Sequence, residues 1–139
     1  PGSGGRTKCW PPENFATVIK TISQNTSLSI LISTGQADGE IAQQIASKST
    51  ARLLPQLPIR QFAALMSKCT VYLGNDSGPS HLAAAMGVPT LALFGPTDPR
   101  IWSPRGATVR TIQASDGEMA SISPKKVFAE LIKLISLNT

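Results

Sequence analysis

A glycine- and serine-rich loop that runs directly into a helical pattern is the segment most suited to chemistry. Gly74–Gly87 reads GNDSGPSHLAAAMG. Pro79 favours the first turn of a helix, so we expect the helix to begin there, with the free amides of Ser80 and His81 pointing off its end. Unpaired N–H groups at a helix N-terminus attract anions, and Gly78 has no side chain to hinder approach. The loop therefore predicts an anion site, although a plain capped helix explains the same residues.

Side chains in and beside this loop extend the predicted site. The hydroxyls of Ser77 and Ser80 lie next to the expected free amides, and His81 is a candidate neutral hydrogen-bond donor or a histidine satisfied by the loop. Asp76 would repel a phosphate, so we expect it to support the loop by accepting backbone amides. The sequence contains neither GxGxxG nor GxxxxGK[ST], which excludes the standard dinucleotide-binding and P-loop motifs.

Charged residues elsewhere have two interpretations each. Lys8 follows a run of glycines and either reaches a phosphate or is a solvated surface lysine. Glu40 falls in the first turn of a helix and either accepts hydrogen bonds from ribose hydroxyls or is a surface glutamate. Arg100 and Arg105 flank Trp102, and the sequence does not decide whether they bind an anion or only aid solubility.

Alternating helical and strand patterns must position these residues. Short apolar runs predict strands, and apolar residues at three- and four-residue spacing predict helices. The expected strands are Leu28–Ser33, Ala51–Leu54, Thr70–Leu73, Thr90–Phe94 and Thr108–Ile112. The expected helices are Glu13–Ser23, Asp38–Ser47, Ile59–Ser67, Pro79–Met86 and one starting at Ser123-Pro124, with Val127, Leu131, Leu134 and Ile135 as its apolar face. This order predicts an α/β fold, a Rossmann-like parallel sheet flanked by helices.

Polar and glycine-rich loops follow several of these strands. Because ligands of open parallel sheets bind beyond the carboxyl ends of the strands, we expect the loops to meet at one edge. The loops are Pro1–Gly5, Thr34–Asp38, Gly74–Gly78 and Gly95–Pro99. Pro1–Gly5 resembles a loop that follows a strand, which would lie upstream, although a Gly/Ser linker has the same composition.

Composition limits the classes of function. The chain has 139 residues, 41% of them hydrophobic, which fits one folded domain and excludes wholesale disorder. The net charge of +5 favours phosphates or an anionic membrane surface but is too small to predict nucleic-acid binding. No apolar run approaches the ~20 residues of a membrane span, and no signal-peptide pattern opens the chain.

Cysteine and histidine usage bears on metals, disulfides and triads. Cys9 and Cys69 are better explained as reduced thiols than as a disulfide. With His81 as the single histidine and no CxxC or HExxH motif, we expect no metal site. The chain has no GxSxG motif, which argues against a Ser-His-Asp triad.

Three segments carry a family resemblance: PGSGGRTKCWPPENFA, STGQADGEIA and GNDSGPSHLAAAMGVPTLALFGPTDPRIWSPRG. They resemble the carboxyl-terminal half of bacterial heptosyltransferases, glycosyltransferase family 9. The resemblance implies a GT-B enzyme whose carboxyl-terminal domain binds a nucleotide sugar. It further implies that Lys8 contacts the donor phosphates, that Glu40 contacts the ribose, and that the catalytic aspartate lies in an amino-terminal half outside this chain. The implied phosphate loop comprises Ser77, Gly78, Pro79, Ser80 and His81.

These observations together predict that residues 1–139 are the donor-binding domain of an inverting glycosyltransferase that needs no metal or other cofactor. The resemblance implies that the reaction transfers heptose from ADP-heptose to the lipopolysaccharide inner core, with the acceptor held by an amino-terminal domain outside this chain. We expect the isolated chain to be inactive, and the enzyme to be cytoplasmic, with peripheral contact to the inner membrane left open. The alternatives are a non-catalytic nucleotide- or phosphate-binding module and a fragment of a nucleotide-sugar epimerase. An epimerase would need additional catalytic acids and histidines, and this chain has one histidine.

Overall fold

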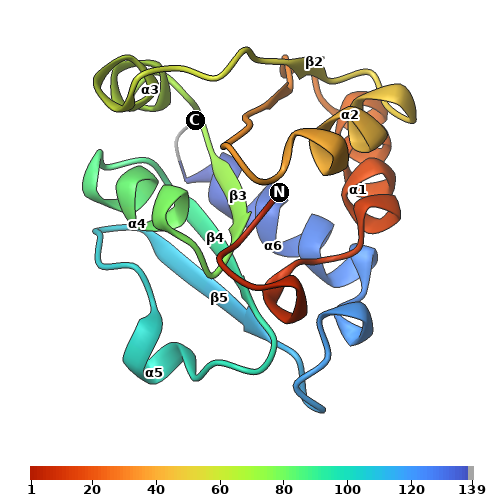
Figure 1. Cartoon of the computed structure of the whole chain (residues 1–139), viewed down its shortest axis with the longest axis vertical. Helices are drawn as coiled ribbons and strands as arrows, with labels where there is room; N and C mark the ends of the chain where they lie inside the picture. Colours follow the sequence, from red (N-terminus) through yellow and green to blue (C-terminus); the bar gives the residue numbers. More distant parts are fainter. Residues whose placement is uncertain (138–139) are drawn as a thin grey trace.

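Strands and helices alternate along the chain (Figure 1). The structure is a computed structural model and describes residues 1–137. Its strands are β1 (Leu31–Ile32), β2 (Arg52–Leu53), β3 (Tyr72–Asn75), β4 (Thr90–Phe94) and β5 (Val109–Gln113). Its α-helices are α1 (Pro12–Asn25), α2 (Gly39–Ser47), α3 (Ile59–Met66), α4 (Gly78–Ala85), α5 (Pro99–Trp102) and α6 (Pro124–Ser136), with 3₁₀ turns η1 (Arg6–Lys8) and η2 (Met119–Ser121).

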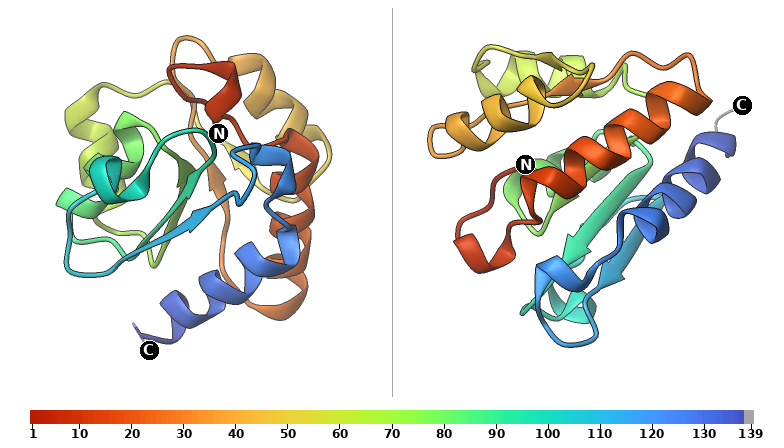
Figure 2. Two further views of the ribbon diagram at one scale, coloured as in Figure 1. Left: turned by 90° about the horizontal axis from the view of Figure 1, so that it is seen from below. Right: turned by 90° about the vertical axis from the view of Figure 1, so that its right-hand side faces the viewer.

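The strands form two parallel sheets, β1–β2 and β3–β4–β5, within the described part of the chain. Helix α6 packs on β4 and against α1, whereas α4 contacts β3 and β4 from the opposite face (Figure 2). Helices therefore cover both faces of the sheet layer, and the predicted α/β fold class is confirmed. Within residues 1–137 the strands form two separate parallel sheets, because β1 and β3 do not pair.

Strand β4 is the centre of the larger sheet. All five of its residues are buried, and it pairs with β3 on one side and β5 on the other. A strand covered on both faces needs apolar side chains throughout, which explains the unbroken run Leu91–Phe94 after Thr90. The predicted bounds of this strand are confirmed.

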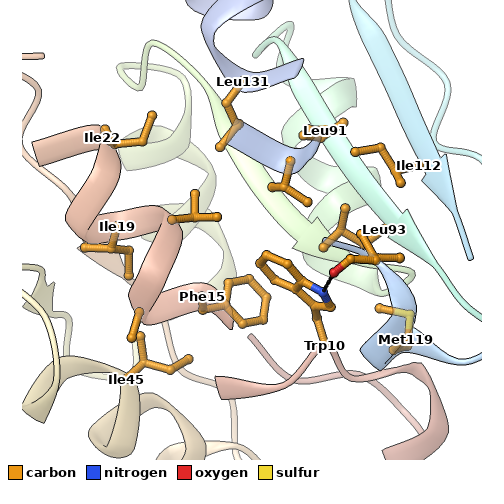
Figure 3. Packing of buried hydrophobic residues seen from close by; sticks show 14 of the residues in the cluster. Trp10, Phe15, Ile19, Ile22, Ile45, Leu91, Leu93, Ile112, Met119 and Leu131 are labelled. Atoms are coloured by element: carbon orange, nitrogen blue, oxygen red, sulfur yellow. Dashed lines mark hydrogen bonds between the residues drawn. The ribbon is translucent and has the colours of Figure 1, made fainter. Parts of the chain in front are cut away.

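Trp10 occupies the middle of the core, where α1, the sheet and α6 meet (Figure 3). Its side chain is fully buried, and its indole N–H donates to the carbonyl of Ile122 at 3.0 Å. Its ring meets Phe15 edge-on with centroids 4.9 Å apart. A buried indole whose N–H is paired can contribute its full apolar area, so Trp10 fixes the opening loop onto the core.

The two long helices begin where the sequence gives start signals. Pro12 opens α1, and in α6 the Ser123 hydroxyl accepts the Lys126 amide at 3.2 Å just before Pro124. Proline fits the first turn because its missing N–H would be unpaired there, and the serine hydroxyl satisfies one of the remaining donors. The predicted apolar face of α6 is largely confirmed, with Val127, Leu131 and Leu134 buried.

Several predicted bounds were wrong by a few residues, and one helix was missed. β1 is much shorter than Leu28–Ser33 because only two of its residues pair with β2. β3 runs on to Asn75 because its pairing with β4 continues through the glycine before it. α5 was taken for loop, although Asp98 and Pro99 form a helix start of the kind seen in α6.

The two cysteines are free in the structure, as predicted. Both Cys9 and Cys69 are half-buried. Among residues 1–137, no helix is long and apolar enough to cross a membrane.

Candidate functional site

Asp76, directly after β3, is the point at which three loops meet. Its carboxylate accepts the Thr97 hydroxyl at 2.8 Å and lies 3.4 Å from the Lys8 ammonium, and its carbonyl accepts the Ser3 hydroxyl at 2.6 Å. Its amide donates to Leu93 at the end of β4. The loops after β3 and β4 and the opening loop are thus joined, which confirms that they converge at one edge of the sheet.

Asp38, before α2, attaches the predicted loop Thr34–Asp38 to the opening loop Pro1–Gly5. Its carboxylate accepts the amides of Gly2 and Gly35 and lies 3.8 Å from the amine of Pro1. From the sequence, Asp38 was expected only at the end of a loop and the start of a helix. The hydrogen bond from Gly35 could have been expected, because a carboxylate three residues after a glycine can accept its amide. The bond from Gly2 spans 36 positions, so no local sequence pattern indicates it.

Asn75 supports the site from beneath. The buried side chain accepts the amide of Trp10 at 3.1 Å and donates to the carbonyl of Pro1. Both ends of the carboxamide are therefore used to hold the opening loop across the end of β3. The sequence analysis did not single out Asn75, because an asparagine after a strand is also a common turn residue.

An open hollow of about 420 Å³ lies above these contacts, at the carboxyl end of the larger sheet. This volume is in the range of small-ligand sites. Of the predicted phosphate-binding residues, the hollow brings together Lys8, Ser77, Gly78 and His81. The other lining residues are Gly4, Asp76, Thr97 and Trp102.

The N-terminus of α4 differs in detail from the prediction. The helix begins at Gly78, and the amides of both Ser80 and His81 already bond the carbonyl of Ser77, at 3.1 and 3.5 Å. The expectation that these two amides are free is therefore wrong. The N–H groups of Ser77 and Gly78 instead have no hydrogen-bond partner among residues 1–137. The predicted anion site is shifted back by three residues, from Ser80 and His81 to Ser77 and Gly78, because the chain becomes helical earlier.

Ser80 and Pro79 lie away from the hollow. The Ser80 side chain is fully buried, and its hydroxyl donates to the carbonyl of Asn75 at 2.6 Å. Pro79 is exposed in the first turn of α4 but does not line the hollow. In this geometry Ser80 holds the loop onto the end of β3, while the exposed Gly78 has open space where a side chain would be.

Lys8 and Asp76 form an ion pair that the sequence analysis did not foresee. The expectation that the Asp76 carboxylate accepts backbone amides is wrong, since its partners are the Lys8 ammonium and the Thr97 hydroxyl. The role of Asp76 in supporting the loop is retained with these different partners. At 3.4 Å the contact is long, and the Lys8 side chain remains 29% exposed. The ammonium can therefore also donate to another anion.

The remaining charged candidates lie outside the hollow. Glu40 is exposed in the first turn of α2 and does not line it. Arg100 is tied to Asp98 by a two-pronged contact, with nitrogen–oxygen distances of 2.8 to 3.1 Å. The hydrogen bonds from Arg100 hold the pKa of Asp98 below its usual value. Arg105 is exposed.

Trp102 and Thr97 are the lining residues that sequence reasoning passed over. Trp102 is 55% exposed at the end of α5 and forms one wall of the hollow. No firm signal in the sequence pointed to Trp102, since single exposed apolar side chains are common on protein surfaces. Thr97 gave no signal either, because its contact with Asp76 depends on the convergence of two loops.

The chemistry that the hollow can support is the binding of an anion. Ser77 and Gly78 present free amides at the positive end of α4, and Lys8 adds a partly exposed ammonium. Asp76 is the one carboxylate among the described lining residues, and it is already paired. Residues 1–137 contain no group of three His, Cys, Asp or Glu side chains placed to hold a metal ion.

Comparison with known proteins gives a consistent family match. The family described as glycosyltransferase family 9 (heptosyltransferase) matches residues 1–132. The chain is 32% identical to lipopolysaccharide heptosyltransferase 3 of Escherichia coli over 102 residues, covering 70% of the chain and 30% of that protein. It is 27% identical to lipopolysaccharide heptosyltransferase 2 of Salmonella typhimurium, covering 95% of the chain and 44% of that protein.

Solved structures agree with this match. The structure of E. coli ADP-heptose lipopolysaccharide heptosyltransferase II superposes with a TM-score of 0.89 at 27% identity, covering 99% of this chain and 45% of that one. A glycosyl transferase family 9 protein from Veillonella parvula superposes with a TM-score of 0.90 at 24% identity, covering 98% and 44%, which shows the shared fold. The chain thus spans less than half the length of these relatives.

Proposed function

The chain belongs to glycosyltransferase family 9, the heptosyltransferase family, and we propose that it is the part of such an enzyme that binds the nucleotide-sugar donor, ADP-heptose. Residues 1–139 would form this donor domain, and the lipopolysaccharide core acceptor would be held by a further domain. The reaction would take place in the cytoplasm, at the inner face of the inner membrane. The donor is proposed from the similar E. coli protein, which is described as an ADP-heptose heptosyltransferase.

The observation that carries this proposal is the free amide pair at the start of α4, next to a partly exposed lysine. A diphosphate can accept hydrogen bonds from the N–H groups of Ser77 and Gly78, with the Ser77 and His81 side chains beside it. The ammonium of Lys8 compensates its charge. Because Gly78 has open space around its Cα, a phosphate oxygen can approach the backbone closely.

The same contacts would assist the transfer step. When the acceptor hydroxyl attacks the sugar, the bond to the diphosphate breaks and negative charge develops on the departing ADP. Amides and an ammonium that are already in place stabilise that charge without reorganisation. We propose that this charge stabilisation replaces a metal ion, so that ADP binds with equal affinity with and without a chelator.

The general base that accepts the proton of the acceptor hydroxyl would lie outside this chain. Asp76 is paired with Lys8 and Thr97, and Asp98 with Arg100, so these acids have structural roles. We therefore propose that the isolated chain binds the donor without transferring the sugar. Turnover by the isolated chain with ADP-heptose and a deacylated core acceptor would contradict this division of roles.

Gly78→Val tests the donor site. A valine side chain at Gly78 meets open space, so the fold is expected to survive, while its methyl groups block the approach of a phosphate to the amides. Titration calorimetry with ADP should show saturable binding by the unchanged chain and none by the variant. Ala85→Val, which adds the same branching at the exposed far end of α4, should bind ADP normally. Equal affinity of all three proteins would exclude this site.

A non-catalytic nucleotide-binding module would give the same calorimetry. The two functions differ when the chain is joined to a complete amino-terminal domain of the family. A donor domain should then support transfer that Gly78→Val abolishes, whereas a binding module should bind ADP and transfer nothing.

A further inference from the structure

Trp102 is an exposed aromatic residue on the wall of the hollow. It is the last residue of α5 and lines the hollow together with Lys8, Gly78 and Thr97. Among residues 1–137, its indole makes no hydrogen bond and no contact with another aromatic ring. Trp10, by contrast, is fully buried and has both kinds of contact. Trp102 therefore offers an apolar face and a free N–H donor to a ligand in the hollow.

The segment that carries Trp102 is fixed at both ends. Before α5, the Thr97 hydroxyl donates to the carboxylate of Asp76, in the loop after β3, at 2.8 Å. After α5, Gly106 lies so close to α4 that a Cβ there would come within 2.7 Å of the Ala84 carbonyl oxygen. Because the segment is already held in place, little further ordering is needed when a ligand contacts the indole.

The place of Trp102 in the sheet indicates which part of the donor it meets. This inference rests on the proposed function, in which the diphosphate lies at the N–H groups of Ser77 and Gly78, at the end of β3. Strand β4 and α5 lie on one side of β3, whereas β1 and α2 lie on the other side, across the apolar cavity (Figure 1). The two ends of a ligand bound through its diphosphate can therefore extend towards α2 and towards α5.

The nucleoside is expected on the α2 side. In nucleotide-binding sheets of this class, an acidic residue beyond a neighbouring strand binds the ribose, and Glu40 at the start of α2 has that place. If the ribose lies towards Glu40, the sugar at the other end of the diphosphate lies towards α5. The residue of α5 that lines the hollow is Trp102.

We propose that Trp102 determines specificity for the sugar of the donor, with the apolar C–H face of the sugar ring stacked on the indole. A pyranose ring has an apolar face and a rim of hydroxyls, which match the face and the N–H of tryptophan. Sites for small ligands commonly combine such an aromatic surface with a few polar groups. Free ADP lacks the sugar and cannot make this contact, so Trp102 favours the sugar nucleotide over ADP.

Titration calorimetry with ADP and with ADP-heptose tests the proposal on the full chain and three variants. Trp102→Ala removes the stacking surface, and Trp102→Phe keeps an aromatic face. Ile101→Ala is the matched control, because Ile101 is an exposed apolar residue of α5 that does not line the hollow. The measured quantity is the affinity for ADP-heptose divided by the affinity for ADP.

This ratio should fall by at least about fivefold in Trp102→Ala, because only the sugar nucleotide loses a contact. It should stay near the unchanged value in Trp102→Phe and in Ile101→Ala. Acrylamide quenching of fluorescence gives a second readout, since the chain has two tryptophans and Trp10 is fully buried. Saturating ADP-heptose should protect Trp102 from the quencher more than saturating ADP does.

An unchanged ratio in Trp102→Ala, with equal protection by the two ligands, would overturn the inference while leaving the donor site in place. An equal loss of affinity for both ligands would also overturn it, since Trp102 would then stack on the adenine, as bases do on aromatic side chains. The failure of the proposed function looks different. In that case the unchanged chain would bind neither ADP nor ADP-heptose, and the inference would fall with it.

Discussion

The β3–β4–β5 sheet is paired along four- and five-residue strands, whereas the β1–β2 sheet is a pair of two-residue strands with both β2 residues exposed. The larger sheet supplies the buried centre of the fold through β4 and also carries the loop after β3, in which the Asp76 amide donates to the carbonyl of Leu93 in β4. In the smaller sheet, β2 packs against helix α2, and Ile32 of β1 belongs to the buried apolar core. The difference indicates that the loop after β3 has a rigid base, whereas the pairing of β1 with β2 extends over only two residues of each strand.

The largest expected effect contrasts a core leucine of β4 with an exposed leucine of β2. Leu93 is fully buried, so Leu93→Ala should lower the free energy of unfolding by about 2–5 kcal/mol, since it removes apolar contacts and leaves a cavity. Leu53 is 40% exposed, and Leu53→Ala should cost less than about 1 kcal/mol. Urea unfolding measures both values. Similar costs at the two positions would show that the sheets contribute equally.

Removing the charge of Lys8 should affect ligand affinity more than stability. Lys8→Ala should weaken ADP binding by about 1.5–3 kcal/mol, roughly ten- to a hundredfold, because a charge-assisted hydrogen bond to the diphosphate is lost. Lys126→Ala, an exposed lysine on α6, is the matched control and should bind ADP normally. Calorimetry that finds equal losses for both variants would mean that Lys8 acts only through the overall charge.

The smallest effect concerns the ionisation of Tyr72, which should change the stability of the fold only at alkaline pH. Burial raises the pKa of Tyr72 in β3 to about 12. Because the pKa is higher in the folded chain than the ordinary 10, stability from this group is present below about pH 10 and is lost as the pH rises towards 12. Tyr72 is the single tyrosine of the chain, so the ultraviolet absorbance of tyrosinate reports on it alone. Titration of the folded protein near pH 10 would show that this edge of β3 is open to water.

The sequence was sufficient to predict the alternation of elements and the convergence of their loops, because apolar periodicity and helix-start residues are local signals. β4 and α6 show this well, since an unbroken apolar run and a Ser-Pro start each have one structural solution. The short β1 was mispredicted because pairing depends on a neighbouring strand rather than on its own residues.

The candidate site was predicted in outline but not in its contacts. Lys8, Ser77, Gly78 and His81 meet at one hollow, as the expected convergence of the loops and the family resemblance implied. The burial of the Ser80 hydroxyl and the pairing of Asp76 with Lys8 and Thr97 depend on how the loops pack together. The Thr97–Asp76 and Lys8–Asp76 contacts join residues that are 21 and 68 positions apart, so local sequence patterns cannot predict them.

We propose above all that the diphosphate of the donor lies at the start of α4. The apolar cavity of about 450 Å³ between β1 and β3 is the other place in the described structure where a ligand could lie. An amide NMR titration of the unchanged chain with ADP tests this directly, because it reports on both places at once. We expect the largest shifts at the amides of Ser77 and Gly78, with the amides of Leu31 and Leu73 unaffected. Saturable ADP binding that leaves Ser77 and Gly78 unchanged and shifts the amides of Leu31 and Leu73 would contradict it.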